Sequence, residues 1–588
     1  MKIPLSWLKD FVNLDDISIE DLAHTLTVAG LEVEEIHYIG LPMPAGRQQT
    51  KLSGLAWDPE KIVVAEIREI MPHPNADRLV LCRLYDGKQE HTVLTGAPNL
   101  IEYKGKSELK KPIKVAYAKE GAEIYDGHQP GFQKTKLQRA KIRGVESYSM
   151  VCSEKELGIS EEHEGILLLD SKLQAGTPLA DVLGDAVLTI AITPNIARNA
   201  NVYGVAREVA ALTGRKLKTM PVEVEAEGSS VKSKVKIEIK NPELNPRFVL
   251  GLIKDIEIKP SPAWVQRRLN LAGMRPINSI VDATNYAMLE LGEPLHAFDY
   301  DALVQRAKGQ VPTIITRTAK KGEKLTTLDD VERKLDDFTV LVCDTSGPLS
   351  IGGVMGGAET EVTEGTRNVL LEGASWNFIN VRRTLNSQRL SSEDAYRFSR
   401  GVHPAMAPRG VSRGLELMRQ WSGGTVSKGL VDKYPLKAKD AVVEIGTEDV
   451  KRWLGIELTV KEISSILRKL EFVVTLKGKK LSIKTPDHRL DIGAGVIGMA
   501  DLMEEIARIY GYEMIPATRL SDQLPPQRSN RALELEERVR DLLATLGVQE
   551  IITYRLTSPE QEARRLAPGT APDDKPYIAL ANPISQER

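Results

Sequence analysis

The spacing of apolar residues changes along this chain, and each change marks an expected element. Residues 19–29 place apolar side chains three and four positions apart, which predicts a helix that begins at Ser18 and ends near Gly30. Between residues 58 and 170, short alternating runs such as KIVVAEIREI and HTVLTGAPN are separated by turn residues at hairpin-like intervals. That pattern predicts short strands that form a small β-barrel.

The pattern changes again in the rest of the chain. Residues 193–214 predict an N-capped helix that ends on Gly214, and a mixed α/β region follows from about residue 240 to 420. Residues 435–486 predict the order strand, helix, helix, strand, strand, in a compact unit that ends near Ala517. Residues 529–559 predict a long helix followed by a strand, and the chain stops at IALANPISQER without the composition of a tail. We therefore expect the last domain to be incomplete.

Length and composition indicate a protein of several domains. The chain has 588 residues, far beyond the size at which one hydrophobic core keeps growing. It is 41% hydrophobic and 27% charged, and no apolar run approaches the roughly 20 residues needed to cross a bilayer. The N-terminus, MKIPLSWLKDFVNLDD, lacks the unbroken apolar core of a signal peptide. We expect a cytoplasmic protein with no membrane partner.

Charge gives no global sign of nucleic-acid binding, so any RNA site must be local. The chain carries 79 basic and 81 acidic residues, for a net charge of -2. One local candidate is the lysine-rich stretch KGKSELKKPIK, which contains Lys110 and Lys111, although such a run is often only a solvated face. The three cysteines lie far apart without a CxxC pair, which predicts neither a disulfide framework nor a zinc site.

A three-part pattern lies on the predicted barrel: HPNADRLVLCRL at 73–84, TGAPN at 95–99 and SYSMVCSEKELGI at 147–159. In this order the parts resemble the tRNA-binding oligonucleotide-fold module of several translation proteins. Such a barrel can follow an RNA backbone with basic and polar loops. We expect tRNA contacts at His73, Asn75, Arg78, Lys110 and Lys111. The alternative is that the stretch from His73 to Arg78 forms an Asx-type turn that only organises the fold.

Three further motifs extend the resemblance over the whole chain: MKIPLSWLKDF at the N-terminus, ITPNIARNANVYGVAREVAALTG at 192–214 and SSEDAYRFSRGVHP at 391–404. With them the chain resembles the β subunit of bacterial phenylalanyl-tRNA synthetase, truncated at its C-terminus. The resemblance implies a multidomain α+β fold. Its modules would be an N-terminal α/β module (1–54 and 183–215), an inserted OB-type tRNA-binding barrel (55–182), an α/β B3/B4 editing domain (216–434), a B5 unit (435–517) and the start of a class II synthetase-like antiparallel-sheet module (518–588).

The resemblance also implies a function. In that family the β subunit partners an α subunit in an α2β2 tetramer, and α carries the ATP, phenylalanine and adenylate chemistry. The β subunit would bind tRNA(Phe) and hydrolyse mischarged Tyr-tRNA(Phe). Two other hypotheses stay open, a non-catalytic tRNA-binding scaffold and a free-standing hydrolase that edits in trans. The helix expected near residues 529–547 argues against the second, since it resembles the part that packs on α.

A lone histidine, His296, lies in the mostly apolar stretch LGEPLHAFDYDAL. Taken alone, His296 can be a histidine that only packs and hydrogen-bonds in the core. The resemblance implies instead an editing pocket formed by Thr284, Asn285, His296 and Glu372, with Gly352 and Gly353. A phenylalanine site cannot strongly reject tyrosine, which only adds a hydroxyl, so a second site must remove the error. We expect Glu372 to accept the tyrosyl hydroxyl, and the glycines to let the backbone approach the ligand.

Four acids in DHRLDIGAGVIGMADLMEEIARIYGY form a second candidate site. Asp501, Glu504 and Glu505 lie close together on a predicted helix, where like charges repel unless a cation lies among them. The resemblance implies that these three and Asp491 hold a Mg²⁺ ion shared with the α subunit. The alternative is that the helix dipole alone favours acids in the first turn. The glycine-rich loop is longer than is usual in the family, which can move Asp491 out of reach.

Overall fold

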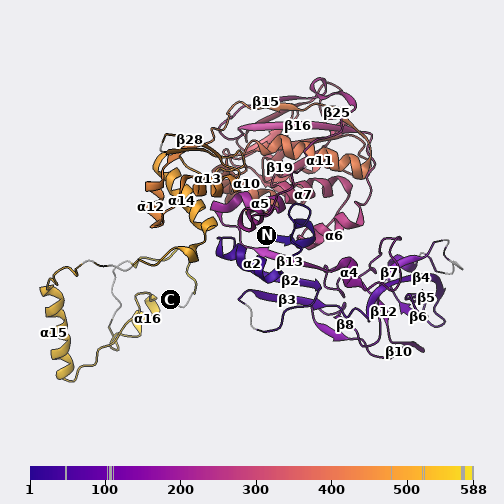
Figure 1. Cartoon of the computed structure of the whole chain (residues 1–588), viewed down its shortest axis with the longest axis horizontal. Helices are drawn as coiled ribbons and strands as arrows, with labels where there is room; N and C mark the ends of the chain where they lie inside the picture. Colours follow the sequence, from indigo (N-terminus) through magenta and orange to yellow (C-terminus); the bar gives the residue numbers. More distant parts are fainter. Residues whose placement is uncertain are drawn as a thin grey trace. The chain divides into compact units, whose positions relative to one another are not determined.

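The computed structural model describes the chain except residues 47–48, 102, 105–108, 110, 221, 479, 519–520, 522, 571–576 and 586–588. The chain divides into two compact units, Met1–Pro516 and Ala517–Arg588. Every sheet that the described residues form lies in the first unit. The expectation of a mixed α+β protein built from several modules is confirmed (Figure 1). Among the described residues, no helix is both long enough and apolar enough to cross a membrane.

Two distant parts of the chain meet in one four-stranded sheet near the N-terminus. Its strands are, in spatial order, β1 (Lys2–Pro4), β13 (Asp185–Ile190), β2 (Val33–Gly40) and β3 (Lys51–Ala56). β2 pairs parallel with β3 and antiparallel with β13, and the register places Asp185 opposite Gly40. The segment between β3 and β13 is therefore inserted between two strands of this sheet.

The helices of this module start where a side chain caps them. α1 (Leu5–Leu8) is short, and α2 (Ile19–Val28) follows Ser18, whose hydroxyl accepts the Asp21 N–H at 3.0 Å. The single helix expected over 193–214 is instead a 3₁₀ helix, η1 (Pro194–Asn199), followed by α5 (Val202–Thr213). The break occurs because Asn201 has an extended backbone and its side chain accepts the Gly204 N–H, which starts a new helix.

The inserted segment forms a five-stranded antiparallel sheet. Its strands are, in spatial order, β12 (Met150–Val151), β7 (Ile113–Ala118), β4 (Ile62–Pro72), β5 (Val80–Tyr85) and β6 (Glu90–Thr95). The long central strand β4 pairs with β7 through its first half and with β5 through its second. Smaller elements are β8 (Glu123–Tyr125), β9 (Lys134–Lys136), β10 (Ala140–Ile142), β11 (Val145–Ser147), α3 (Pro98–Ile101) and α4 (Leu179–Leu183). The predicted strands are present, while closure into a barrel stays a prediction.

Two sheets build the region that contains His296 and Glu372 (Figure 1). The larger sheet has the order β14 (Gly228–Ser230), β25 (Thr425–Lys428), β16 (Arg247–Lys254), β24 (Val369–Ser375) and β17 (Leu295–Asp299), with β26 (Val431–Lys433) also paired to β16. The smaller sheet has the order β15 (Lys236–Ile239), β18 (Thr313–Thr318), β21 (Val340–Cys343), β22 (Pro348–Ile351) and β23 (Met355–Gly356). Helix α11 (Met406–Ser422) packs on β16 and β24, and α7 (Ser279–Leu291) packs on α11.

Other elements of this region are short. They are η2 (Val231–Ser233), α6 (Ala263–Leu271), α8 (Tyr300–Arg306), β19 (Lys324–Thr326), β20 (Glu332–Lys334), η3 (Ala358–Thr360), α9 (Phe378–Gln388) and α10 (Glu393–Phe398). After them, β27 (Val442–Ile445), β29 (Lys480–Lys484) and β28 (Val473–Lys477) form a three-stranded antiparallel sheet with α12 (Thr447–Leu454), α13 (Val460–Lys469), α14 (Gly495–Tyr510) and η4 (Tyr512–Met514). The predicted order strand, helix, helix, strand, strand is confirmed.

The second unit contains the helices α15 (Arg531–Thr545) and α16 (Pro559–Ala563). The long helix expected after residue 529 is therefore present. The strand expected after it is not, and the described residues of this unit form no strand, so the expected antiparallel sheet does not begin here. The physical reason is that an isolated strand leaves its backbone N–H and C=O groups unpaired, and the described residues of this unit offer no second strand to pair with them.

Candidate functional site

His296 and Glu372 occupy directly opposite positions on the neighbouring antiparallel strands β17 and β24. Residues that face each other across such a ladder point to the same side of the sheet. The next residue of β24, Gly373, points to the other side, where a side chain would meet Val411 of α11. His296 and Glu372 therefore share the face of the sheet that is turned away from α11.

Both side chains line a small cavity on that face. The wall is completed by β22, the turn into β23, and α10, which contribute Gly353, Gly356 and Asp394 among others. The volume open to the centre of a water-sized sphere is only about 20 Å³. That is room for about one water molecule. The cavity is therefore narrow in this state of the protein.

Burial keeps the His296 imidazole neutral. Its Nε2 atom is buried and has no hydrogen-bond partner in the described part of the chain. The Phe298 ring, two residues along the same strand, meets it edge to face with the centroids 4.4 Å apart. Burial lowers the pKa of His296 to about 4, because an imidazolium ion loses its hydration there. At pH 7 the imidazole thus presents an unoccupied ring nitrogen to the cavity.

Burial has the opposite effect on the carboxyl groups. It raises the pKa of Glu372 to about 8, with a further contribution from the negative charge of Asp394. It also raises the pKa of Asp394, the second residue of α10, to about 6. The Oε2 atom of Glu372 is buried and, among the described residues, unpaired. Glu293 is a third buried acid nearby, and burial raises its pKa well above the usual range.

At three glycines the backbone lies so close to the aromatic and imidazole rings of the site that a side chain would clash with them. Gly353 lies in the left-handed region with φ 68°, and a side chain there would meet the Trp376 ring at 2.6 Å. A side chain at Gly352 would meet the same ring at 2.8 Å, and Gly352 does not line the cavity itself. Gly356 lies against His296, since a Cβ atom at this position would be 2.4 Å from the imidazole Cε1. These contacts are with rings of the protein, and the expected approach of Gly352 and Gly353 to a ligand stays a prediction.

The structure does not bring Thr284 and Asn285 to this cavity. Neither residue lines it, and both belong to α7, whose Glu290 pairs with Arg413 of α11 at 2.7 Å. The α7–α11 pair covers the face of the sheet opposite to His296 and Glu372. The Thr284 hydroxyl donates to the carbonyl of Val281 at 2.7 Å and so is used within its own helix. The predicted set of six residues is therefore brought together only in part.

Sequence reasoning did not place Asp394, Gly356 and Trp376 at this site. Asp394 lies in the motif SSEDAYRFSRGVHP and Gly356 in SIGGVMGG, so both occur in stretches with a visible sequence signal. Trp376 lies four residues after Glu372 in LLEGASW, and the return of the chain after β24 brings its ring to the cavity wall. The missed residues come from three separate segments, which explains why spacing along the chain cannot group them.

The predicted tRNA contacts divide into buried and exposed residues. His73 is only 6% exposed, and its Nδ1 atom accepts the Asn75 N–H at 3.0 Å, as the turn interpretation predicts. Asn75, Arg78 and Lys111 are exposed. Lys110 lies outside the described residues. The surface available to tRNA in this stretch is therefore formed by the exposed members and not by the imidazole.

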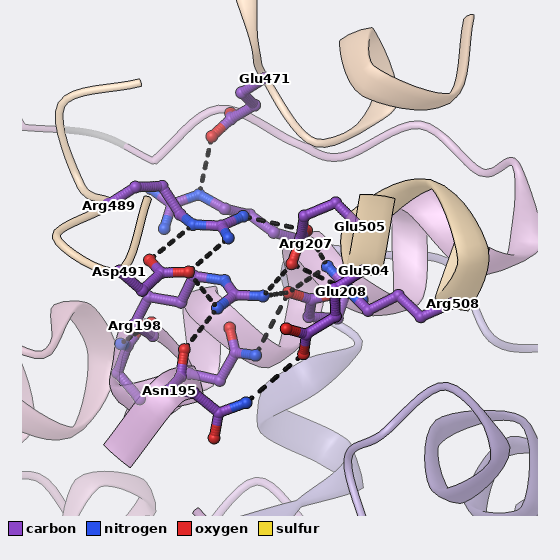
Figure 2. Close-up of polar contacts among 12 residues, drawn as sticks. Asn195, Arg198, Arg207, Glu208, Glu471, Arg489, Asp491, Glu504, Glu505 and Arg508 are labelled. Atoms are coloured by element: carbon purple, nitrogen blue, oxygen red, sulfur yellow. Dashed lines mark hydrogen bonds and ion pairs between the residues drawn. The ribbon is translucent and has the colours of Figure 1, made fainter. Parts of the chain in front are cut away.

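The four acids predicted to hold Mg²⁺ do not converge on one point. Among the described residues, no group of three or more His, Cys, Asp or Glu side chains is arranged to hold a metal ion. Asp491 and Glu505 instead accept hydrogen bonds from Arg489 (Figure 2). The negative charge that a cation was expected to neutralise is neutralised by guanidinium groups. In this structure the four acids therefore do not form a set of free oxygen ligands that fits a magnesium ion.

Comparison with known families assigns the regions described above. Residues 62–178 match the putative tRNA binding domain, 244–423 the B3/4 domain, 443–512 the tRNA synthetase B5 domain, and 515–588 the phenylalanyl tRNA synthetase beta chain CLM domain. His296, Glu372 and Asp394 all fall within the B3/4 match. The junction of Arg489 with Asp491 and Glu505 falls within the B5 match.

Curated relatives match over the full length of the chain. The phenylalanine–tRNA ligase beta subunit of Dehalococcoides mccartyi is 38% identical over 601 residues, which cover 100% of this chain and 69% of the relative. Those of Moorella thermoacetica and Syntrophus aciditrophicus are 38% and 36% identical, each over 100% of this chain and 68% of the relative.

Among solved structures, an N-terminal fragment of the phenylalanyl-tRNA synthetase beta subunit from Pyrococcus horikoshii is 17% identical, with a TM-score of 0.30 over 56% of this chain and 88% of the fragment. The modules and the full-length relatives define a subunit of an aminoacyl-tRNA synthetase. The chain belongs to the family of phenylalanine–tRNA ligase beta subunits.

Proposed function

We propose that the chain acts as the β subunit of a phenylalanine–tRNA ligase, binds tRNA(Phe), and hydrolyses tyrosine that has been attached to this tRNA in error. Membership of the family and the matched tRNA-binding domain support the ligase and tRNA roles. The observation that carries the editing role is the paired, buried His296 and Glu372, each with a polar atom that has no partner in the described chain.

Glu372 is the residue that we assign to the tyrosyl hydroxyl. A neutral carboxyl donates through its O–H and accepts through its C=O, so it can pair with a phenol in either direction. A phenylalanyl group would cover the same oxygen and leave it unpaired, at a cost of about 1–3 kcal/mol. That cost corresponds to a preference for tyrosine of roughly 5- to 150-fold. Asp394 supports this role, because its charge contributes to keeping the proton on Glu372.

His296 is the residue that we assign to the attacking water. In this step the water oxygen adds to the carbonyl carbon of the aminoacyl ester, the bond to the ribose oxygen breaks, and that oxygen takes up a proton. A neutral imidazole nitrogen can accept the hydrogen bond of the water and pass its proton to the leaving oxygen. With a pKa of about 4 this imidazole is a weak base, so its main contribution is to orient the water.

The synthetic chemistry belongs, in this proposal, to an α subunit that uses ATP and Mg²⁺ in an α2β2 tetramer in the cytoplasm. Family membership is the main support. A second support is α15, which exposes apolar side chains suited to a partner surface, namely Leu533, Leu535, Val539, Leu542 and Leu543.

The test is to co-purify the chain with the α subunit of the same organism and to measure phenylalanylation and Tyr-tRNA(Phe) deacylation on one sample. We expect both activities, with deacylation reduced in His296→Ala and Glu372→Ala while phenylalanylation continues. Phenylalanylation without deacylation in the wild type would favour the scaffold hypothesis and refute the editing assignment. Deacylation by the chain alone, with no complex formed, would favour the free-standing hydrolase.

A further inference from the structure

We infer that Asp491 and Glu505 are the acceptors of a buried arginine junction and not ligands of a magnesium ion. The junction joins the motif at residues 195–208 to the B5 region at residues 489–508 (Figure 2). It consists of the guanidinium groups of Arg198, Arg489 and Arg508 and the carboxylates of Glu208, Asp491 and Glu505.

Arg489 holds both acids of the B5 region. Its Nε and Nη2 atoms donate to the two oxygens of Asp491 at 2.8 and 2.5 Å, in a bidentate pair. Its Nη1 atom donates to Oε2 of Glu505 at 3.0 Å. The Arg489 side chain is only 1% exposed, so these contacts are shielded from water. Arg489 thus occupies both oxygens of Asp491 and one oxygen of Glu505.

Arg508 connects α14 to α5. Its Nη1 atom donates to Oε2 of Glu208 at 2.6 Å, and its Nε and Nη2 atoms donate to Glu505 at 3.1 and 2.5 Å. Glu208 also accepts from Nδ2 of Asn199 at 3.2 Å. The side chains of Arg508 and Glu208 are 4% and 3% exposed. This pair crosses about 300 positions of sequence, so it fixes two distant segments against each other.

Arg198 closes the junction from the 3₁₀ helix η1. Its Nη1 atom donates to Asp491 and its Nη2 atom to Glu505, both at 3.2 Å, and Nη2 lies 3.3 Å from Glu208. Each carboxylate therefore has at least two guanidinium partners. Three positive and three negative groups balance, which leaves no net charge to attract a further cation. The motif TPNIARNANVYGVAREV supplies one side of this arrangement, which gives it a structural role.

The geometry leaves no room for Mg²⁺ on these oxygens. The ion requires oxygen ligands at about 2.0–2.1 Å in near-octahedral order. Both oxygens of Asp491 and both oxygens of Glu505 already accept hydrogen bonds from arginines. A divalent ion would have to displace those arginines and then lie beside three positive groups. The junction itself neutralises the acids.

The other two acids of the predicted site have different surroundings. Oδ2 of Asp501 accepts the Gly493 N–H at 2.7 Å, which fixes the glycine-rich loop before α14. Glu504 is exposed, and its Oε1 atom lies 3.5 Å from Nδ2 of Asn195. Asp501 and Glu504 therefore contact different segments of the chain. They do not join Asp491 and Glu505 in the one set of four metal ligands that the sequence suggests.

Thermal unfolding of the full chain, in EDTA and in millimolar Mg²⁺, tests the inference. We expect the wild type to unfold at the same midpoint in both buffers, and Arg489→Gln, Arg198→Gln and Asp491→Asn to lower that midpoint equally in both. Combining Arg198→Gln with Asp491→Asn should lower it by less than the sum of the single changes, because both remove one shared contact. The matched control is Glu504→Gln, an exposed acid on the same helix, which should leave the midpoint unchanged.

Direct titration with Mn²⁺, a paramagnetic ion that also prefers carboxylate oxygens, gives a second measurement that does not depend on the stability of any variant. We expect wild-type chain and Glu505→Gln to take up equally little Mn²⁺, as followed by the loss of the free-ion electron spin resonance signal. The inference is overturned if Mg²⁺ raises the wild-type midpoint and Asp491→Asn abolishes that rise. It is also overturned if the wild type binds one Mn²⁺ tightly and Glu505→Gln releases it.

Discussion

Nε2 of His296 and Oε2 of Glu372, on residues paired across β17 and β24, are both buried and both without a hydrogen-bond partner in the described part of the chain. Burial shifts their pKa values apart, to about 4 and about 8, so both groups are neutral at pH 7. A buried polar atom without a partner costs about 1–3 kcal/mol. That cost is removed when a ligand supplies the missing partner, which supports the proposed role of the pair in recognition.

Replacement of His296 by alanine should slow the deacylation of Tyr-tRNA(Phe) by roughly 100-fold, because the attacking water loses the group that orients it. Single-turnover deacylation measures this directly. Because the imidazole titrates at about 4, protonation of His296 should not slow the wild-type reaction between pH 7 and pH 5.5. A rate that falls with a midpoint near pH 6.5 would show that His296 is hydrated like a free histidine.

The variant Glu372→Gln should gain stability relative to the wild type as the pH rises from 4.5 to 8. An unfolded glutamate ionises at 4.5, whereas Glu372 in the folded chain keeps its proton up to about 8. The folded state therefore binds more protons in this window, and the wild type loses about 1.4 kcal/mol per pH unit, or about 3 kcal/mol by pH 7. Denaturant unfolding of both proteins at several pH values gives the difference, which should level off above pH 8.

Asp394→Asn should lower the upper end of that pH window. The charge of Asp394 is the second cause of the raised pKa of Glu372, after burial, so its removal makes Glu372 easier to ionise. The measurement is the same comparison of glutamate and glutamine at position 372, carried out in the Asp394→Asn background. An unchanged window would mean that the two carboxyl groups do not interact.

Gly356→Ala should impair deacylation by at least about 10-fold, because displacement of a catalytic group by an ångström is costly. The new Cβ atom would lie 2.4 Å from Cε1 of His296, so the imidazole must move. The matched control is Gly365→Ala, whose Cβ atom would have Thr363 Oγ1 at 3.7 Å as its nearest contact. Rates for the two variants, measured beside their unfolding midpoints, separate loss of geometry from loss of fold.

Arg78→Ala and Lys111→Ala should weaken tRNA binding and reduce the slope of log affinity against log salt by about one each, if each contacts a phosphate. Both residues are exposed. His73→Ala should instead lower stability, because the imidazole is buried and accepts the Asn75 N–H. Lys437, exposed in a different module, provides the control substitution. Filter binding at several salt concentrations distinguishes these outcomes.

The sequence predicted those helix and strand boundaries that depend on contacts between residues close together in the chain. Ser18 caps α2 with its own hydroxyl, and Gly214 ends α5 with φ 69°, so each boundary depends on a residue and its near neighbours. The alternation of Val80, Cys82 and Leu84 likewise follows from one face of one strand being buried. The resemblance to a family then placed His296, Glu372 and Gly353 in one site, and the structure brings these three together.

The features that the sequence did not predict depend on contacts between residues that are distant in sequence. Thr284 and Asn285 lie close to His296 along the chain, but the turn at Gly292 sends α7 and β17 to different layers. The magnesium prediction considered only the acids that lie near Glu505 in sequence. Spacing along the chain cannot show that Arg198, 307 positions away, donates a hydrogen bond to the Glu505 carboxylate. The prediction of a strand after α15 was wrong for the same reason. A strand is stable only beside a second strand, and the local sequence pattern does not show whether one is present.

The narrowness of the cavity has a kinetic consequence. Because the space open to the centre of a water-sized sphere is only about 20 Å³, the proposed editing reaction requires the cavity to widen before an aromatic side chain can enter. The apparent affinity for an incoming aminoacyl end is then reduced by the fraction of molecules that are open. In the proposed reaction, the movement that widens the cavity is therefore a separate kinetic step that comes before cleavage of the ester bond.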